Sequence, residues 1–91
     1  MYKISLYSYK QAKKIGVNIK PSKRKNKKID VYKGDKYITS IGDSRYLDYP
    51  QYKKLFGAEI AENKRKAYKK RHIKDINIKN SAGYYASRIL W

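Results

Sequence analysis

Apolar and polar positions alternate most clearly between residues 29 and 41. Two runs rich in β-branched and aromatic residues flank Gly34-Asp35, a dipeptide that suits a two-residue hairpin turn. The register set by this turn places two pairs of residues opposite each other, Tyr32 with Tyr37 and Val31 with Ile38. The pattern predicts a β-hairpin over about residues 29–41, with the Val31–Ile38 pair and Ile29 facing the core.

Apolar positions follow helical spacing over about residues 50–72. Pro50 suits the first turn of a helix, and Phe56, Ile60 and Ala67 would share its apolar side. Gly57 lies within this segment, where glycine is unfavourable, and predicts a kink or a break between two helices. The acidic residues lie toward its start and the basic residues toward its end, as the helix dipole favours. We expect the main basic helix here.

A shorter apolar pattern at the C-terminus predicts a last helix over about residues 81–90, capped by Ser81. One face of this helix would carry four small or apolar residues: Ala82, Tyr85, Ala86 and Ile89. The large apolar side chain of Trp91 is expected to dock on the domain or on a neighbouring chain, not to extend into water.

The N-terminal third carries a weaker pattern. Residues 2–9 alternate partly and predict a short strand, followed by a helical turn that Ser8 would cap and Gly16 would end in the left-handed conformation. Residues 20–28, "KPSKRKNKK", predict a loop that is extended at Lys20 because Pro21 follows. Residues 1–28 are therefore expected to form a basic arm that is mobile without an anionic partner. Residues 29–91 would form the compact unit of a small α+β domain.

Charge is the dominant compositional feature of this chain of 91 residues. It has 24 Lys plus Arg against 7 Asp plus Glu, which gives a formal net charge of +17. Such a chain repels itself, so a polyanion or an acidic protein surface is expected to stabilise it. Lysine, which outnumbers arginine, suits sequence-independent contact with phosphates. An AT-rich genome would account for part of the lysine content, but not for the shortage of acids.

Several classes of protein are disfavoured by the composition. The chain has no cysteine and one histidine, which excludes disulfides and thiolate metal sites and makes a transition-metal site improbable. No apolar run is long enough to span a membrane, and the N-terminus lacks the apolar core of a signal peptide. We expect no cofactor, no metal and no membrane partner, and an intracellular protein or one packaged in an intracellular assembly.

Two groups of residues are candidates for catalysis. His72 and Asp75 are close enough in sequence to pair across one helical turn, but no nucleophile accompanies them. Asp43 and Asp48 flank Arg45, and two acids can bind a divalent metal, but a third acid at suitable spacing is missing. A local turn at Asp43 and a helix cap at Asp48 are the simpler interpretation. The sequence thus favours a protein that is not an enzyme.

The cluster "KRKAYKKRH" at residues 64–72 and the loop at residues 20–28 are the candidate binding segments. Arg71 is placed near the apolar side of the main helix, so it is expected to be structural and paired with Asp48, Asp43 or a C-terminal carboxylate. Tyr68 and Trp91 are assigned to packing or partner docking. The predicted anion-binding set consists of nine basic residues: Lys20, Lys23, Arg24, Lys25, Lys27, Lys28, Lys66, Lys69 and Lys70. Tyrosines lie among these charges, where core packing is favoured over stacking on unpaired bases.

Three segments resemble a family of small basic proteins encoded by large DNA viruses and tailed phages. They are "SIGDSRYLDYP", the spaced frame of Arg65, Tyr68, Arg71 and His72, and "GYYASRILW". The resemblance extends from about residue 12 to residue 91, and Ala82 stands where the family commonly has a proline. The family has no established catalytic residues. The resemblance therefore implies a viral or phage source and not a specific chemistry.

Taken together, charge and resemblance predict a non-enzymatic virion protein, either an auxiliary or minor capsid protein or a packaged one. It would be part of a larger assembly, in the virion and, during infection, in the host cytoplasm. Its partners would be capsid or other virion proteins, the phosphates of the genome, or both. The alternative is a free, sequence-independent DNA- or RNA-binding protein that acts during infection. A nuclease that uses Asp43, Asp48 and His72 is the third candidate.

Overall fold

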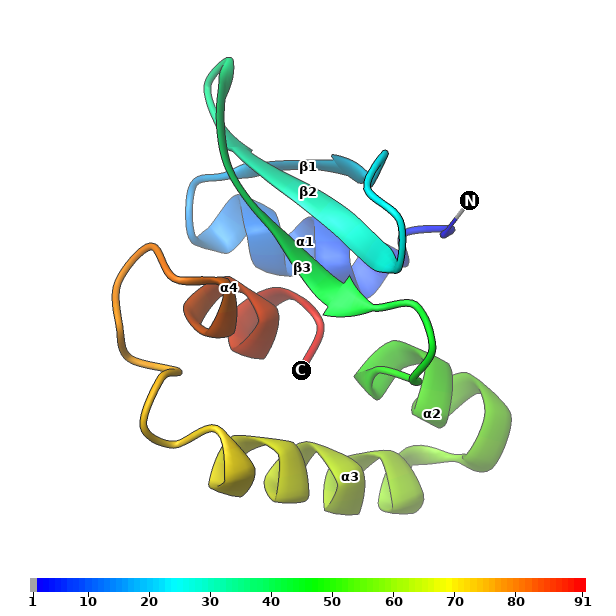
Figure 1. Ribbon diagram of the computed structural model, residues 1–91. Coiled ribbons are helices and arrows are strands. Elements are labelled where there is room, and N and C mark those ends of the chain that lie inside the picture. Colours follow the sequence, from blue (N-terminus) through cyan, green and yellow to red (C-terminus); the bar gives the residue numbers. More distant parts are fainter. Residues whose placement is uncertain (1) are drawn as a thin grey trace.

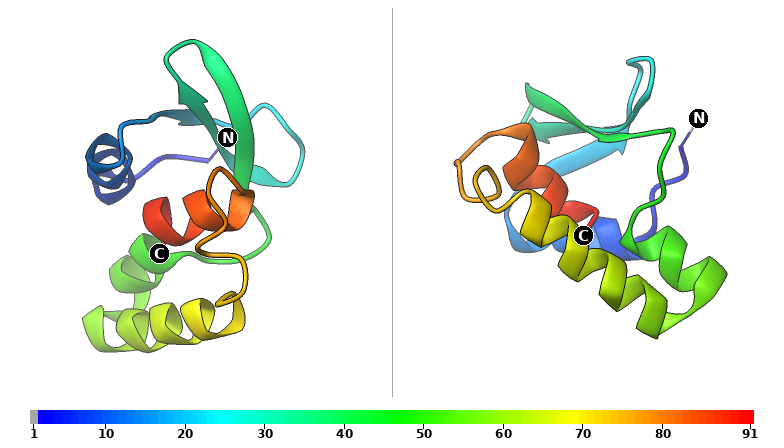
Figure 2. Two further views of the ribbon diagram at one scale, coloured as in Figure 1. Left: turned by 90° about the vertical axis from the view of Figure 1, so that its left-hand side faces the viewer. Right: turned by 60° about the horizontal axis from the view of Figure 1, so that its bottom comes forward.

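The computed structural model describes residues 2–91, which form a three-stranded antiparallel sheet and four helices (Figure 1). In chain order the elements are α1 (Leu6–Lys14), β1 (Asn18–Pro21), β2 (Lys27–Lys33), β3 (Lys36–Asp43), α2 (Tyr49–Phe56), α3 (Ala58–Arg71) and α4 (Ala82–Ile89). The sheet forms one layer, α1 and α4 pack beneath it, and α2 and α3 lie on the far side of α4 (Figures 1 and 2). The predicted α+β class, hairpin and C-terminal helix are confirmed.

The sheet has the order β1-β2-β3, and the hairpin forms around Gly34-Asp35 as predicted. Tyr32 pairs with Tyr37, which confirms the first predicted pair. Val31, however, pairs with Thr39 and not with Ile38, because the register shifts between Val31 and Tyr32. An irregularity of this kind inserts a residue into one strand, and the spacing of residues in the sequence does not reveal it.

The predicted strand over residues 2–9 is wrong, because α1 begins at Leu6. Ser5, not Ser8, is the N-cap, and its side chain accepts a hydrogen bond from the Ser8 N–H. Ser8 is instead buried, and its hydroxyl donates to the carbonyl of Ile89 at 2.9 Å. The partial alternation of residues 2–9 therefore does not produce a strand, because residues 6–14 form a helix that packs one face on α4. Gly16 does end this segment with a φ of +76°, as predicted.

The hydrophobic core joins the sheet to α1 and α4. The first 19 residues supply four of its buried side chains, Ile4, Ala12, Val17 and Ile19. They pack with residues of the two longer strands and of the C-terminal segment, Ile29, Val31, Ile41, Tyr85, Ala86, Ile89 and Leu90. Residue 28 is therefore not a domain boundary, since the N-terminal segment is part of the single core and not a separate arm.

The predicted main helix is two helices, α2 and α3. Gly57 separates them with a φ of +93°, a conformation that favours glycine, so the predicted break is confirmed. Asp48 caps α2 and exchanges hydrogen bonds with Gln51 in a capping box. The predicted apolar side of Phe56, Ile60 and Ala67 is wrong, because all three are exposed.

The C-terminal helix begins as predicted, with the Ser81 side chain accepting from the Tyr84 N–H. Three of the four residues predicted on its buried face are buried, and Ala82 is exposed. Trp91 docks on the domain itself, where its ring stacks on that of Tyr68.

Candidate nucleic-acid interface

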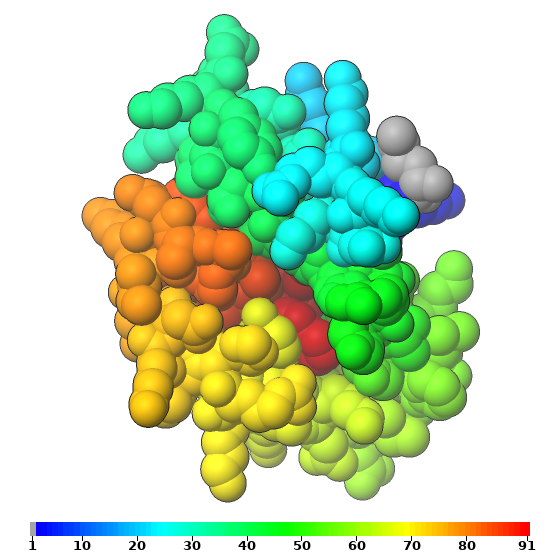
Figure 3. Space-filling view, in the orientation of Figure 1, coloured from blue at the N-terminus to red at the C-terminus, as the bar shows by residue number. Residues whose placement is uncertain are grey.

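A groove of about 530 Å³ opens between the sheet and α3, within the roughly 300–1,000 Å³ typical of small-molecule sites. One wall is the end of β3 with residues 43–48, the other is α3, and α4 and the C-terminus form the floor. In the space-filling view the C-terminal residues are visible at the bottom of this hollow, between residues coloured cyan and green and residues coloured yellow (Figure 3). We call this feature the central groove.

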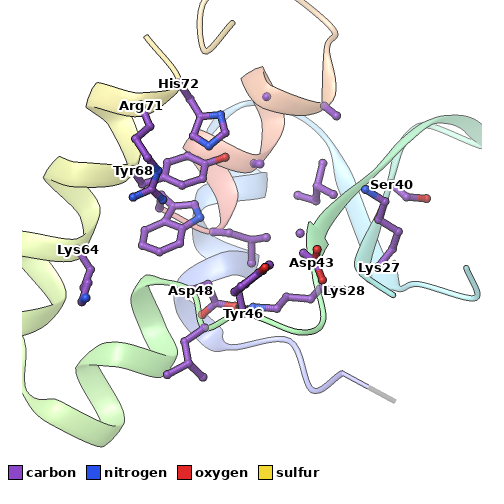
Figure 4. A pocket seen from close by; sticks show the side chains of 18 of the residues that line it. Lys27, Lys28, Ser40, Asp43, Tyr46, Asp48, Lys64, Tyr68, Arg71 and His72 are labelled. Atoms are coloured by element: carbon purple, nitrogen blue, oxygen red, sulfur yellow. Dashed lines mark hydrogen bonds and ion pairs between the residues drawn. The ribbon is translucent and has the colours of Figure 1, made fainter. Parts of the chain in front are cut away.

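Aromatic rings line much of the central groove (Figure 4). Tyr68 and Trp91 stack with centroids 4.5 Å apart and planes 8° from parallel. His72 lies on the Tyr68 ring at 4.3 Å, and Tyr52 approaches Trp91 at 6.2 Å. Burial and the nearby Asp75 carboxylate raise the pKa of Tyr68 to about 12. The prediction that Tyr68 and Trp91 serve packing agrees with this stack.

Three cationic side chains stand at the rim of the central groove: Lys27, Lys64 and Arg71. Lys27 belongs to the basic segment at residues 20–28, whereas the other two belong to the basic cluster on α3. On α3 the groove-lining residues Lys64, Tyr68 and Arg71 follow the i, i+4, i+7 spacing of one helix face. The fold therefore brings both basic segments to opposite sides of one aromatic hollow, which the sequence did not predict.

The predicted structural role of Arg71 is wrong. Its side chain is exposed and forms no ion pair with the acids of residues 2–91 or with the C-terminal carboxylate. The two proposed partners are already engaged, Asp48 by Lys28 and Asp43 by Arg45. The structural arginine of α3 is instead Arg65, which pairs with Glu62 and lies over a tyrosine ring.

Lys28 must be removed from the predicted anion-binding set. Its side chain is 3% exposed, and its ammonium lies 3.0 Å from a carboxylate oxygen of Asp48 and 3.0 Å from the side-chain oxygen of Gln51. A lysine buried in this way is not available to a phosphate. Residues 28–31 of β2 are all buried, so both faces of the strand are covered there. A run of charges in the sequence does not show that the face opposite Ile29 and Val31 is also covered.

The remaining predicted residues of the 20–28 segment are at the surface. The predicted loop over residues 20–28 is too long, because β1 extends to Pro21 and β2 begins at Lys27. Lys20 lies exposed on β1, extended as predicted, and Lys23, Arg24 and Lys25 lie exposed in the turn between the strands. This turn is fixed by Asp30, which accepts hydrogen bonds from the Ser22 hydroxyl at 2.6 Å and from the Lys23 N–H at 3.4 Å.

The three predicted lysines of α3 are exposed but do not line the central groove: Lys66, Lys69 and Lys70. Partial burial, followed by the positive charges of Arg65 and Arg88, lowers the pKa of Lys69. Lys64, which does line the groove, is not among the residues predicted from the sequence. The helical spacing of Lys64 to Tyr68 was the signal that could have identified it.

Of the three carboxylates that line the groove, those of Asp43 and Asp48 are held by local structure, whereas Asp75 Oδ1 is buried and has no hydrogen-bond partner among residues 2–91. Asp43 accepts from the backbone N–H and the guanidinium of Arg45, as the predicted local turn requires, and these bonds lower its pKa to about 2. His72 Nδ1 lies 3.8 Å from Asp75 Oδ1, so the predicted pair is confirmed as a neighbour pair. No cluster of three or more potential metal ligands occurs within residues 2–91.

Helices long and apolar enough to cross a membrane are also lacking in the described part of the chain. Comparison with protein-family models, with curated proteins and with solved structures found no match to this chain. The resemblance to viral and phage proteins therefore stays a prediction.

Proposed function

We propose that this chain is a non-enzymatic, sequence-independent nucleic-acid-binding protein of a virus particle, which contacts the phosphates of the packaged genome. The observation that carries this proposal is the placement of Lys27 on one side of the central groove and of Lys64 and Arg71 on the other. A backbone lying along the groove would meet cations from both basic segments at once.

The charge balance of the folded chain supports the same proposal. Within residues 2–91, ion pairs with carboxylates engage three of the 24 Lys and Arg side chains: Lys28, Arg45 and Arg65. The other cations lack a partner carboxylate and repel one another. A polyanion would relieve this repulsion and release its own counterions, which is the main source of sequence-independent affinity for nucleic acids.

The virion setting rests on the resemblance to viral and phage proteins and not on residue chemistry. Mass spectrometry of purified virions tests it. Detection of the chain in particles supports the packaged protein, and its absence from particles favours the free DNA- or RNA-binding protein.

Salt dependence of binding tests the contact with phosphates. For duplex DNA the logarithm of the binding constant should fall with the logarithm of salt concentration, by about 0.9 for each phosphate contacted. Lys27→Gln and Arg71→Gln should each reduce this slope by about 1. Lys13→Gln is the matched control, because Lys13 is exposed on α1, away from the groove. An absence of binding at low salt would refute the proposal.

The nuclease alternative has little support, because Asp43 and Asp48 are both held by neighbouring residues. Cleavage of plasmid DNA in the presence of magnesium, lost in Asp43→Asn, would reverse this ranking. Asp43 is the better position for this test, since the Asp43–Arg45 pair is at the surface, whereas Asp48 is buried and caps α2.

Contact with capsid protein is the second candidate function, and an apolar surface between α1 and α2 favours it. Leu6 and Leu55 are 69% and 61% exposed there, with Lys3 and Lys54 beside them. Such a surface suits an acidic protein with apolar side chains at the contact. Co-sedimentation with particles that is lost in Leu55→Ser, while DNA binding is unchanged, would support this candidate.

A further inference from the structure

We propose that the central groove holds an unpaired nucleobase, so that the preferred ligand is a single strand and not a duplex. This inference rests on the proposed function and adds the class of nucleic acid. The base would lie between Tyr46 on one wall and Trp91 on the floor, with the flanking phosphates on Lys27, Lys64 and Arg71.

The aromatic walls are suited to a base. The Tyr46 ring is 68% exposed, and it lines the groove across from Tyr68 (Figure 4). Trp91 stacks on Tyr68 at 4.5 Å, and Tyr68 also lies against His72 at 4.3 Å. These contacts hold the Trp91 ring in place and leave Trp91, and not Tyr68, as the second surface for a base. A preformed, partly exposed aromatic surface next to cations is the arrangement by which proteins bind single strands without sequence preference.

The shape of the site separates single strands from duplexes. The groove is a hollow of about 530 Å³ bounded on both sides by protein. In a duplex the faces of the bases are covered by stacking, so an aromatic side chain in a hollow cannot reach them. A single strand can turn one base into the hollow and keep its phosphates at the cationic rim.

The ammonium and guanidinium groups at the rim explain why the groove would favour a nucleotide over a neutral aromatic ligand. Three acids line it: Asp48 pairs with Lys28, Asp43 pairs with Arg45, and Asp75 lies 3.8 Å from His72. Lys27, Lys64 and Arg71 have no such partner among residues 2–91. The rim therefore attracts anions while the walls accept a flat ring.

The chain carries an internal probe for this site, because Trp91 is its only tryptophan. Three ligands of equal length should be compared: a single-stranded thymidine oligonucleotide, an abasic deoxyribose-phosphate oligomer and a duplex. Binding is followed by fluorescence anisotropy of a labelled ligand, and base stacking by quenching of the Trp91 emission. We expect all three to bind at low salt, the single strand most tightly, and only the single strand to quench Trp91.

The matched variants are Tyr46→Ala and Tyr9→Ala. Tyr46 and Tyr9 are both exposed, at 68% and 47%, but Tyr9 lies on α1, outside the groove. Loss of one stacking surface should weaken binding of the single strand about tenfold in Tyr46→Ala and leave the abasic oligomer unaffected. Tyr9→Ala should change neither.

The outcomes separate the two proposals. Equal affinity for the single strand and the abasic oligomer, without quenching of Trp91, would overturn the base-binding groove and leave phosphate binding intact. Equal losses in Tyr46→Ala and Tyr9→Ala would also overturn it. Failure of all three ligands to bind at low salt would refute the proposed function itself.

Discussion

At the scale of single residues, the buried pair of Lys28 and Asp48 is the main electrostatic feature. Asp48 also accepts a hydrogen bond from the Tyr2 hydroxyl at 2.6 Å. Burial, together with this bond to a carboxylate, raises the pKa of Tyr2. One aspartate thus joins the N-terminal segment, β2 and the start of α2.

Removal of one member of this pair should leave an uncompensated buried charge. We expect Lys28→Met to lower the free energy of unfolding by about 3–5 kcal/mol. Urea denaturation followed by circular dichroism measures the change. Lys27→Met is the control, because Lys27 is only half-buried and has no carboxylate partner among residues 2–91. Similar losses in both variants would contradict the assignment.

Asp30 is the second buried acid with a structural role. Burial alone would raise its pKa, but hydrogen bonds from Ser22, Ser40 and the Lys23 N–H outweigh burial and lower it. The ionised carboxylate therefore holds the 22–26 turn against β2 and β3. Three exposed cations, Lys23, Arg24 and Lys25, lie in this turn, so the hydrogen bonds of Asp30 help to fix where they are placed.

The stability that Asp30 contributes should depend on pH. Because its pKa is lower in the folded state, the contribution is complete above the unfolded value of 3.8 and is lost as pH falls through the folded value. Asp30→Asn should therefore destabilise the protein at pH 7 and approach the wild type as pH falls progressively below 3.8. Urea denaturation at pH 7, 5 and 3 tests this expectation. A difference between the two proteins that is constant over this range would contradict it.

At the scale of elements, the orientation of α3 differs from the one expected from its sequence. The side that carries Ile60 and Ala67 is exposed, and a different side packs against the rest of the domain. Ala61 is its only fully buried residue, and Tyr68 is half-buried against Trp91. Ile60 is 44% exposed. The break at Gly57 resets the direction of the chain, so apolar residues before and after it do not belong to one continuous side.

Two alanines of α3 provide a matched test of its orientation. Ala61→Gln places a long polar side chain in a fully buried position and should cost about 1–3 kcal/mol. Ala67→Gln changes an exposed position and should stay within about 0.5 kcal/mol of the wild type. Thermal unfolding of both variants measures the difference. A larger loss of stability in Ala67→Gln than in Ala61→Gln would contradict this orientation of α3 and support the one expected from the sequence.

At the scale of the whole molecule, the N-terminal segment completes the fold. Its helix α1 is tied to α4 by two hydrogen bonds, from the Ser8 hydroxyl to the Ile89 carbonyl and from the Gln11 side chain to the Arg88 carbonyl. It also covers the sheet with the apolar residues noted above. A chain of this size buries a small hydrophobic core, so the loss of a few core side chains should prevent stable folding.

The isolated fragment 29–91 should therefore fail to unfold cooperatively, because it lacks α1, β1 and part of the core. Circular dichroism during thermal unfolding tests this expectation. The control is the full chain with Lys23, Arg24 and Lys25 replaced by serine, which should fold normally since these side chains are exposed. A cooperative transition in the fragment would show that residues 1–28 are a dispensable arm.

Local rules in the sequence determined a substantial part of this protein. The turn at Gly34-Asp35, the cap at Asp48, the break at Gly57 and the cap at Ser81 all lie where the sequence places them. Each depends on residues within a few positions of one another, whose conformational preferences are strong. The net charge, which predicts an anionic partner, is likewise a property of composition alone.

Tertiary structure decided what depends on contacts between distant segments. It buried Lys28 against Asp48, left Arg71 at the surface and placed residues 5–8 at the start of a helix that packs on the C-terminus. It also brought Lys27, Tyr46, Lys64 and Trp91 to one groove. A charge pattern gives the number of cations but not the direction in which each points. That direction follows from which faces pack, and packing is set by the whole chain.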